Sequence, residues 1–129
     1  MGRRRTLEVP GVTHGAPIPM GARLGNLVFS SGIPGKDPVD DSLPPDPARQ
    51  VELMFQNVRT LMEQAGGTLD DIAHMTVFVK DGSYREHLNR EWVKAFPEPD
   101  DRPARHTLVW NLPGDMLIQC ELVAVLGGP

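Results

Sequence analysis

Apolar residues recur every three or four positions along two stretches of the chain, which is the spacing of one face of an α-helix. The first stretch covers residues 47–65, with Asp46 as the expected N-cap and Gly66-Gly67 as the end. The second opens at Ser83 to Glu86, which have the spacing of a capping box, and its apolar positions continue to Phe96. We therefore predict two amphipathic helices.

The remaining apolar segments are rich in β-branched and aromatic residues, which favours strands. They are a turn or short strand at 20–24, and strands at 26–31, 72–80, 104–111 and 116–126. The Pro-, Gly- and Asp-rich stretch 32–47 is expected to be a loop. The order β-β-α-β-α-β-β predicts an α+β, two-layer domain in which two helices cover one face of a mixed β-sheet.

The last predicted strand has two unlike faces. One face is wholly apolar and suits a core under the helices: Ile118, Cys120, Leu122 and Ala124. The other face carries a polar pair between apolar neighbours: Leu117, Gln119, Glu121, Val123 and Val125. This mixture is unusual both for a solvent-facing surface and for a core. It predicts a subunit interface with a wet pocket, and hence an oligomer.

Length and composition support one soluble domain over residues 1–129, with residues 1–6 expected to be a flexible leader. The net charge of −4 gives no attraction to nucleic acid, so no nucleic-acid partner is expected. No apolar run is long enough for a membrane span. The single cysteine, Cys120, fits a reducing, cytoplasmic location and is read as a buried apolar residue. The four histidines lack metal-ligand spacing, so no metal site is expected.

Several short motifs follow one another between residues 20 and 125. They are Leu24 to Pro34 (LGNLVFSSGIP), Asp71 to Asp81 (DIAHMTVFVKD), the helix residue Asn89, Pro103-Ala104-Arg105 and Leu112-Pro113. Together they resemble the motifs of the Rid (YjgF-type) family: its LGN…SGQIP segment (here short by the one Gln), its D(V/I)xKTTVFLKD strand, its helix asparagine, its PAR motif and its LP turn. Each motif is weak alone, and their shared order makes the resemblance specific.

This resemblance implies a chorismate-mutase-like fold, a homotrimer, clefts for small molecules between subunits, and no cofactor. Well-known Rid proteins hydrolyse reactive enamines and imines, such as 2-aminoacrylate, to a keto acid and ammonia. Their arginine in the PAR motif binds the substrate carboxylate, which gives that role to Arg105. A guanidinium fork matches a carboxylate in shape and charge. The alternative is that Arg105 forms a surface ion pair with Asp100 or Asp101.

Further candidates for the cleft follow from motif position. Ser31, Asn89 and Thr107 are expected to line it. Ile18 lies where the family commonly has a tyrosine, and Gln119 lies where the deaminases carry the glutamate that contacts the attacking water. Glutamine can orient water but cannot take its proton. Glu121 shares the face of Gln119, about 6–7 Å along the strand, so both are candidate catalytic residues.

Two functions stay open on the sequence alone. One is hydrolysis of an enamine, an imine or a related small carboxylate. The other is a binding module that keeps the carboxylate clamp but has lost the deaminase chemistry. Ribonuclease activity, claimed for some relatives, is disfavoured by the acidic charge and the lack of a basic stripe.

Overall fold

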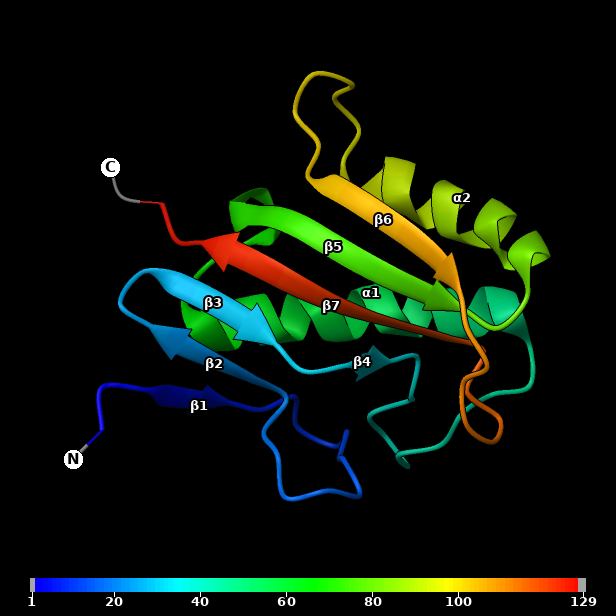
Figure 1. Ribbon diagram of the computed structural model, residues 1–129, viewed down its shortest axis with the longest axis horizontal. Coiled ribbons are helices and arrows are strands. Elements are labelled where there is room, and N and C mark those ends of the chain that lie inside the picture. Colours follow the sequence, from blue (N-terminus) through cyan, green and yellow to red (C-terminus); the bar gives the residue numbers. More distant parts are fainter. Residues whose placement is uncertain (1, 128–129) are drawn as a thin grey trace.

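A computed structural model gives the structure of the chain and describes residues 2–127. Within these residues, seven strands form one sheet, and two α-helices pack against it (Figure 1). The strands are β1 (Arg5–Leu7), β2 (Gly21–Leu24), β3 (Leu27–Ser30), β4 (Ile33–Pro34), β5 (Ile72–Val79), β6 (Ala104–Val109) and β7 (Ile118–Val125). The helices are α1 (Pro47–Ala65) and α2 (Arg85–Ala95), joined to the strands through short 3-10 turns, η1 (Leu69–Asp71) and η2 (Gly82–Tyr84).

Strand β7 lies inside the sheet, whose order is β1-β2-β3-β7-β5-β6. β3 pairs with residues 123–125 of β7 and β4 with residues 119–120, so these two short strands share β7 as a partner. β5 runs antiparallel to β7 and parallel to β6. A parallel pair needs a long crossover connection, and the segment that contains α2 supplies it between β5 and β6.

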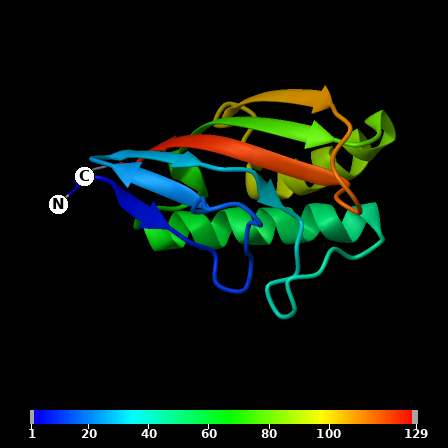
Figure 2. The ribbon, with the colours of Figure 1, turned by 60° about the horizontal axis from the view of Figure 1, so that its bottom comes forward.

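Both helices lie on the same side of the sheet, which gives the predicted two-layer α+β architecture (Figure 2). Helix α1 packs beneath β4 and β7, and α2 packs beside α1. The shared core takes one face of each central strand, and its largest wholly buried side chains include Phe55, Met54, Leu61, Met75 and Ile118. The fold class predicted from the sequence is confirmed.

The alternation predicted for the last strand is also confirmed. Ile118, Cys120, Leu122 and Ala124 are buried, whereas their neighbours in between are half-buried or exposed. The face of the sheet that the helices leave open keeps large apolar groups at the surface: Phe29 is 48% exposed, Val125 43% and Leu27 38%. This open face therefore exposes large apolar side chains beside its polar ones and has no covering layer within residues 2–127.

The ends of α1 form as the sequence predicts. Asp46 caps the helix, because its carboxylate accepts a hydrogen bond from the backbone N–H of Ala48. Gly66 ends it in the left-handed region at φ 88°, and its N–H donates to the carbonyl of Glu63. Gly67 donates to the carbonyl of Met62, which completes the C-terminal cap.

The start of α2 differs from the prediction. Ser83 and Glu86 do not form a capping box at the start of this helix. Instead, the carboxylate of Asp81 accepts from the backbone N–H and the hydroxyl of Ser83, which caps the 3-10 turn η2. The same two bonds lower the pKa of Asp81. The helix begins at Arg85 with Tyr84 as its N-cap, one residue later than the motif indicates, because η2 occupies the first turn.

Two more expectations need correction. Arg5 and Thr6, placed by the sequence in a flexible leader over residues 1–6, lie in β1 and pair with β2, and Arg5 also donates to the carbonyl of Gln64; Met1 lies outside the described residues. The stretch 32–47 is not all loop, because Ile33 and Pro34 form β4 on the free edge of β7. Isolated short edge strands carry too few alternating residues to be recognised in the sequence.

None of the helices within residues 2–127 is long and apolar enough to cross a membrane.

One buried side chain fixes the turn between β6 and β7. Gln50 of α1 has no exposed surface. Its Nε2 donates to the carbonyls of Pro44 and Asp115, both at 2.8 Å, and its Oε1 accepts from the N–H of Leu117 at 2.9 Å. Because that N–H bonds to Gln50 and not to a neighbouring strand, β7 begins at Ile118, two residues later than predicted.

The Gln50→Leu substitution should therefore destabilise the protein by about 2–4 kcal/mol, since it leaves three backbone groups without their partner. Unfolding in urea, followed by circular dichroism, measures the change. Gln56→Leu on the exposed side of the same helix is the matched control and should shift stability by less than about 0.5 kcal/mol. Equal effects of the two substitutions would show that the Gln50 bonds contribute little.

Candidate functional site

Arg105 lies at the start of β6 and points toward the helical layer. In the parallel register it pairs with Met75, a buried residue of the core face, so both side chains lie on the side of α2. Its Nη2 donates to Oδ1 of Asn89 at 2.8 Å, and its guanidinium lies 4.9 Å from the centre of the Trp92 ring. Arg105 is thus held from two sides by α2.

No carboxylate within residues 2–127 forms an ion pair with Arg105. The ion pairs of these residues lie elsewhere, at Lys36–Asp41, Arg49–Glu52 and Lys94–Glu91. The structure therefore does not show the alternative pairing with Asp100 or Asp101. Partial burial, and secondly the positive charge of Arg85, lower the pKa of Arg105. An arginine keeps its charge at neutral pH despite such a shift, so Arg105 offers an unneutralised cation to an anionic ligand.

Asn89 and Thr107 accompany Arg105. Asn89 is exposed on α2 and bonded to the guanidinium, as described above. Thr107 is half-buried and lies two residues further along β6 on the same side of the sheet. The structure thus brings three of the predicted binding residues to one place, which we call the arginine cluster: Asn89, Arg105 and Thr107.

A second group of predicted residues gathers around the end of β3. The hydroxyl of Ser31 donates to the carbonyl of Pro19 at 2.8 Å, and the Ser31 N–H donates to the carbonyl of Met20. These bonds hold the segment that contains Ile18, whose side chain is 48% exposed, beside Ser31. The role of Ser31 in this structure is to fasten that segment.

Gln119 belongs to the same place through Gly32. A Cβ atom added to Gly32 would lie 2.5 Å from Nε2 of Gln119, so the glutamine amide rests directly on the glycine. Gly32 lies inside the LGN…SGIP motif but is not among the residues predicted from the sequence to line the cleft. We call this second group the glutamine cluster: Ile18, Ser31, Gly32 and Gln119.

The two clusters do not meet within one chain. Gln119 pairs with Phe78, and Phe78 pairs with Leu108, so Gln119 is in line with a residue three positions beyond Arg105. β5 separates β7 from β6, which places their backbones about 10 Å apart. Gln119 also lies on the open face and Arg105 on the helical face. A site that uses both residues therefore needs a second copy of the chain.

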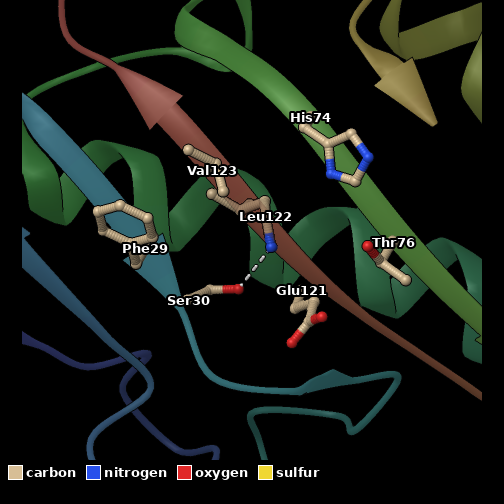
Figure 3. A pocket seen from close by; sticks show the side chains of 7 residues that line it. All are labelled: Phe29, Ser30, His74, Thr76, Glu121, Leu122 and Val123. Carbon is tan, nitrogen blue, oxygen red and sulfur yellow. Dashed lines mark hydrogen bonds between the residues drawn. The ribbon is translucent and has the colours of Figure 1, made fainter. Parts of the chain in front are cut away.

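Glu121 lies in a pocket on the open face (Figure 3). The pocket has a volume of about 220 Å³ and is lined by Phe29, Ser30, His74, Thr76, Glu121, Leu122 and Val123. Ser30 closes its wall, because its hydroxyl oxygen accepts from the N–H of Leu122 at 2.8 Å. Glu121 and Thr76 are partners in the register and lie side by side on this face. The polar hollow predicted within the apolar face is present, away from the arginine cluster.

Comparison with known proteins assigns the family. The sequence model described as endoribonuclease L-PSP, which represents YjgF/Rid proteins, matches residues 18–126, most of the chain. The chain belongs to the Rid (YjgF-type) family.

Individual relatives agree with this assignment. A "RutC family protein" of Haemophilus influenzae is 36% identical over 112 residues, covering 84% of this chain and 86% of that protein. The 2-iminobutanoate/2-iminopropanoate deaminase of Escherichia coli is 35% identical over 111 residues, covering 84% and 87%. The crystal structure of Escherichia coli TdcF with bound serine is also similar: its TM-score is 0.84 at 30% identity, with 95% of this chain and 99% of that chain covered.

Within this Rid protein, Cys120 belongs to neither cluster, because its side chain lies on the core face of β7 and that of Gln119 on the open face. It is wholly buried on the core face of β7, and no predicted role requires it. Burial, and secondly the neighbouring carboxylate of Glu121, raise the pKa of the Cys120 thiol. The thiolate is the reactive form of cysteine, so the folded protein should present an unreactive thiol.

Iodoacetamide should accordingly leave Cys120 unlabelled in the native protein and label it after unfolding in guanidinium chloride, as read by mass spectrometry. Raising the pH from about 7 to about 9 should not speed the native reaction, because the raised pKa keeps the thiol protonated throughout. Rapid labelling of the folded protein would mean that β7 opens frequently.

Proposed function

We propose that this Rid protein hydrolyses a reactive enamine or imine acid to a 2-oxo acid and ammonia, in the cytoplasm and without a cofactor. The observation that carries the proposal is the half-buried guanidinium of Arg105, which Asn89 and Trp92 hold in place and which no carboxylate within residues 2–127 neutralises. A cation prepared in this way suits a small carboxylate. The relative named 2-iminobutanoate/2-iminopropanoate deaminase supports the substrate class.

The site requires a second copy of the chain. The arginine cluster and the glutamine cluster lie on opposite faces of one sheet, so a cleft that uses both would take one cluster from each of two copies. The open face carries exposed apolar side chains at Phe29, Leu27 and Val125, which another copy would bury. We propose a homotrimer in which the glutamine cluster of one copy closes over the arginine cluster of the next.

The chemistry follows from these positions. Arg105 binds the carboxylate of the substrate and so fixes the adjacent C=N carbon. An enamine substrate first takes a proton on its β-carbon and becomes the imine. Water then adds to the C=N carbon, forming a C–O bond while one of its protons passes to nitrogen. The C–N bond breaks as the new hydroxyl gives up its proton to the leaving nitrogen, which releases ammonia and leaves the 2-oxo acid. Gln119 can hydrogen-bond the attacking water and orient it, but its amide cannot accept the proton. Glu121 is the nearest carboxylate along the same face of β7, about 6–7 Å away.

Gln119 also supports a second function, that of a binding module. With Gln119 at the position of the acid and Ile18 at that of the tyrosine, the chain would keep the carboxylate clamp and bind a metabolite without turning it over. An assay for the 2-oxo acid, using 2-aminoacrylate generated by a separate enzyme, distinguishes these functions. Product formed faster than in buffer supports the hydrolase, and binding without acceleration supports the module.

Arg105→Ala should weaken the binding of small carboxylates by about 2–4 kcal/mol, or about 30- to 1,000-fold, because it removes a charge-assisted, bidentate contact. Isothermal titration calorimetry with 2-oxobutanoate measures the loss. Arg105→Lys should recover only part of it, since an ammonium lacks the planar fork.

Light scattering provides the control for Arg105→Ala: the variant and the wild type should both have about three times the chain mass of 14.2 kDa. An unchanged affinity in an intact trimer would leave Arg105 as an ordinary surface residue. A wild type that is monomeric at micromolar concentration would remove the shared site.

Gln119→Glu should raise the rate of 2-iminopropionate hydrolysis, because the carboxylate can take a proton from the attacking water. General acid–base catalysis is typically worth 10²–10⁴-fold. Imines hydrolyse readily without an enzyme, so an increase of about tenfold is expected. Glutamine and glutamate are nearly isosteric, so the close packing of residue 119 against Gly32 should tolerate the change.

Gln56→Glu on the exposed side of α1 is the matched control, because it adds the same charge far from β7. A wild type that is already fast, made slower by Gln119→Glu, would contradict the role given to Gln119. The glutamine would then be required by a different substrate.

A further inference from the structure

A second arginine lies on the helix face that holds Arg105. Arg85 is the first residue of α2 and precedes Asn89 by four positions, so the two side chains lie one turn apart on one face of the helix. Asn89 is the residue bonded to the Arg105 guanidinium at 2.8 Å. Arg85 therefore continues the arginine cluster along α2, although it is not among the residues predicted from the sequence.

The side chain of Arg85 reaches the strip of β6 beyond Thr107. A Cβ atom added to Gly82 would lie 3.0 Å from Nη1 of Arg85 and 3.7 Å from Cγ2 of Val109, so helix and strand approach the same point there. Val109 lies on the same side of β6 as Arg105 and Thr107, because residues alternate along a strand. Thr107 thus lies between two guanidinium groups, one from each end of the strip.

Both charges are unneutralised within residues 2–127. Neither arginine takes part in an ion pair there, and Glu86, the neighbour of Arg85 in the sequence, is not within salt-bridge distance of it. The two groups also interact, since the charge of Arg85 contributes to the lowered pKa of Arg105. Two like charges held on one strip repel each other, and a ligand with two anionic groups would relieve that repulsion.

We infer that the acid bound at this site carries a second anionic group, and that Arg85 is the residue that selects it. The first carboxylate binds Arg105, the short carbon chain passes over Thr107, and the second anionic group binds Arg85. This inference rests on the proposed function, because it assumes that Arg105 binds the substrate carboxylate. It adds a substrate class, a short-chain diacid with an imine or oxo group at carbon 2.

Two 2-oxo acids of equal chain length test the inference: 2-oxoglutarate, with two carboxylates, and 2-oxopentanoate, with one. Calorimetry on the full-length protein should show roughly tenfold tighter binding of 2-oxoglutarate, a modest ratio because the Arg85 side chain is exposed. Arg85→Gln should bring the ratio of the two affinities close to one. Arg90→Gln, which removes the same charge from an exposed position of the same helix, is the matched control and should preserve the ratio.

The outcomes separate the inference from the proposed function. If both acids bind equally to the wild type and Arg85→Gln changes nothing, the inference is overturned while the carboxylate site stands. If Arg90→Gln reduces the preference as much as Arg85→Gln does, the selection is a general effect of charge and the inference is also overturned. If neither acid binds to the folded protein, both the proposed function and the inference fail.

Discussion

The strict alternation of side chains along β7 is the constraint on which the rest of the structure depends. Its four buried residues form the centre of the core above α1, while the residues between them face the open side. Three other strands, β3, β4 and β5, take their register from it. A shift of β7 by one residue would exchange the two faces, which would bury Glu121 and expose Leu122, so the register is strongly fixed.

This constraint also explains why the candidate site is divided. Gln119 is directed to the open face by β7, and Arg105 is directed to the helical face by its pairing with Met75. Each position is set by the core of a single chain, and neither can turn toward the other without breaking that core. The proposed hydrolysis would therefore depend on how copies of the chain associate, whereas the stability of the single chain would not.

Much of the fold could be predicted from the sequence, because long periodic segments carry strong signals. The helix 47–65 has an apolar face, a cap and a glycine end, and all three are present. The short edge strands β1 and β4 were missed since two or three residues show no period. The capping box predicted at Ser83 does not form, because the side chain of Asp81, which lies just before it, bonds to Ser83 instead. A short motif is therefore also an unreliable guide to where a helix begins.

The site was harder to predict, because motif order indicates which residues matter but not which of them meet. Arg105 and Asn89 are 16 positions apart in the sequence and were predicted separately to line the cleft, and only the structure shows the hydrogen bond between them. Gly32 and Arg85 were missed, since a glycine under an amide and an arginine one turn from an asparagine leave no distinctive pattern. Their importance appears only when β7, β6 and α2 are placed together.

The two-faced strand also has an evolutionary consequence. Positions 119, 121, 123 and 125 lie in one stretch of chain with the core, yet their side chains make no part of it. Mutations at these positions can change which groups meet a ligand while the helices keep the same apolar surface beneath them. Such mutations leave the core of the single chain intact and act instead on the contacts that a ligand or a second copy would make with β7, so specificity can change while the fold stays the same.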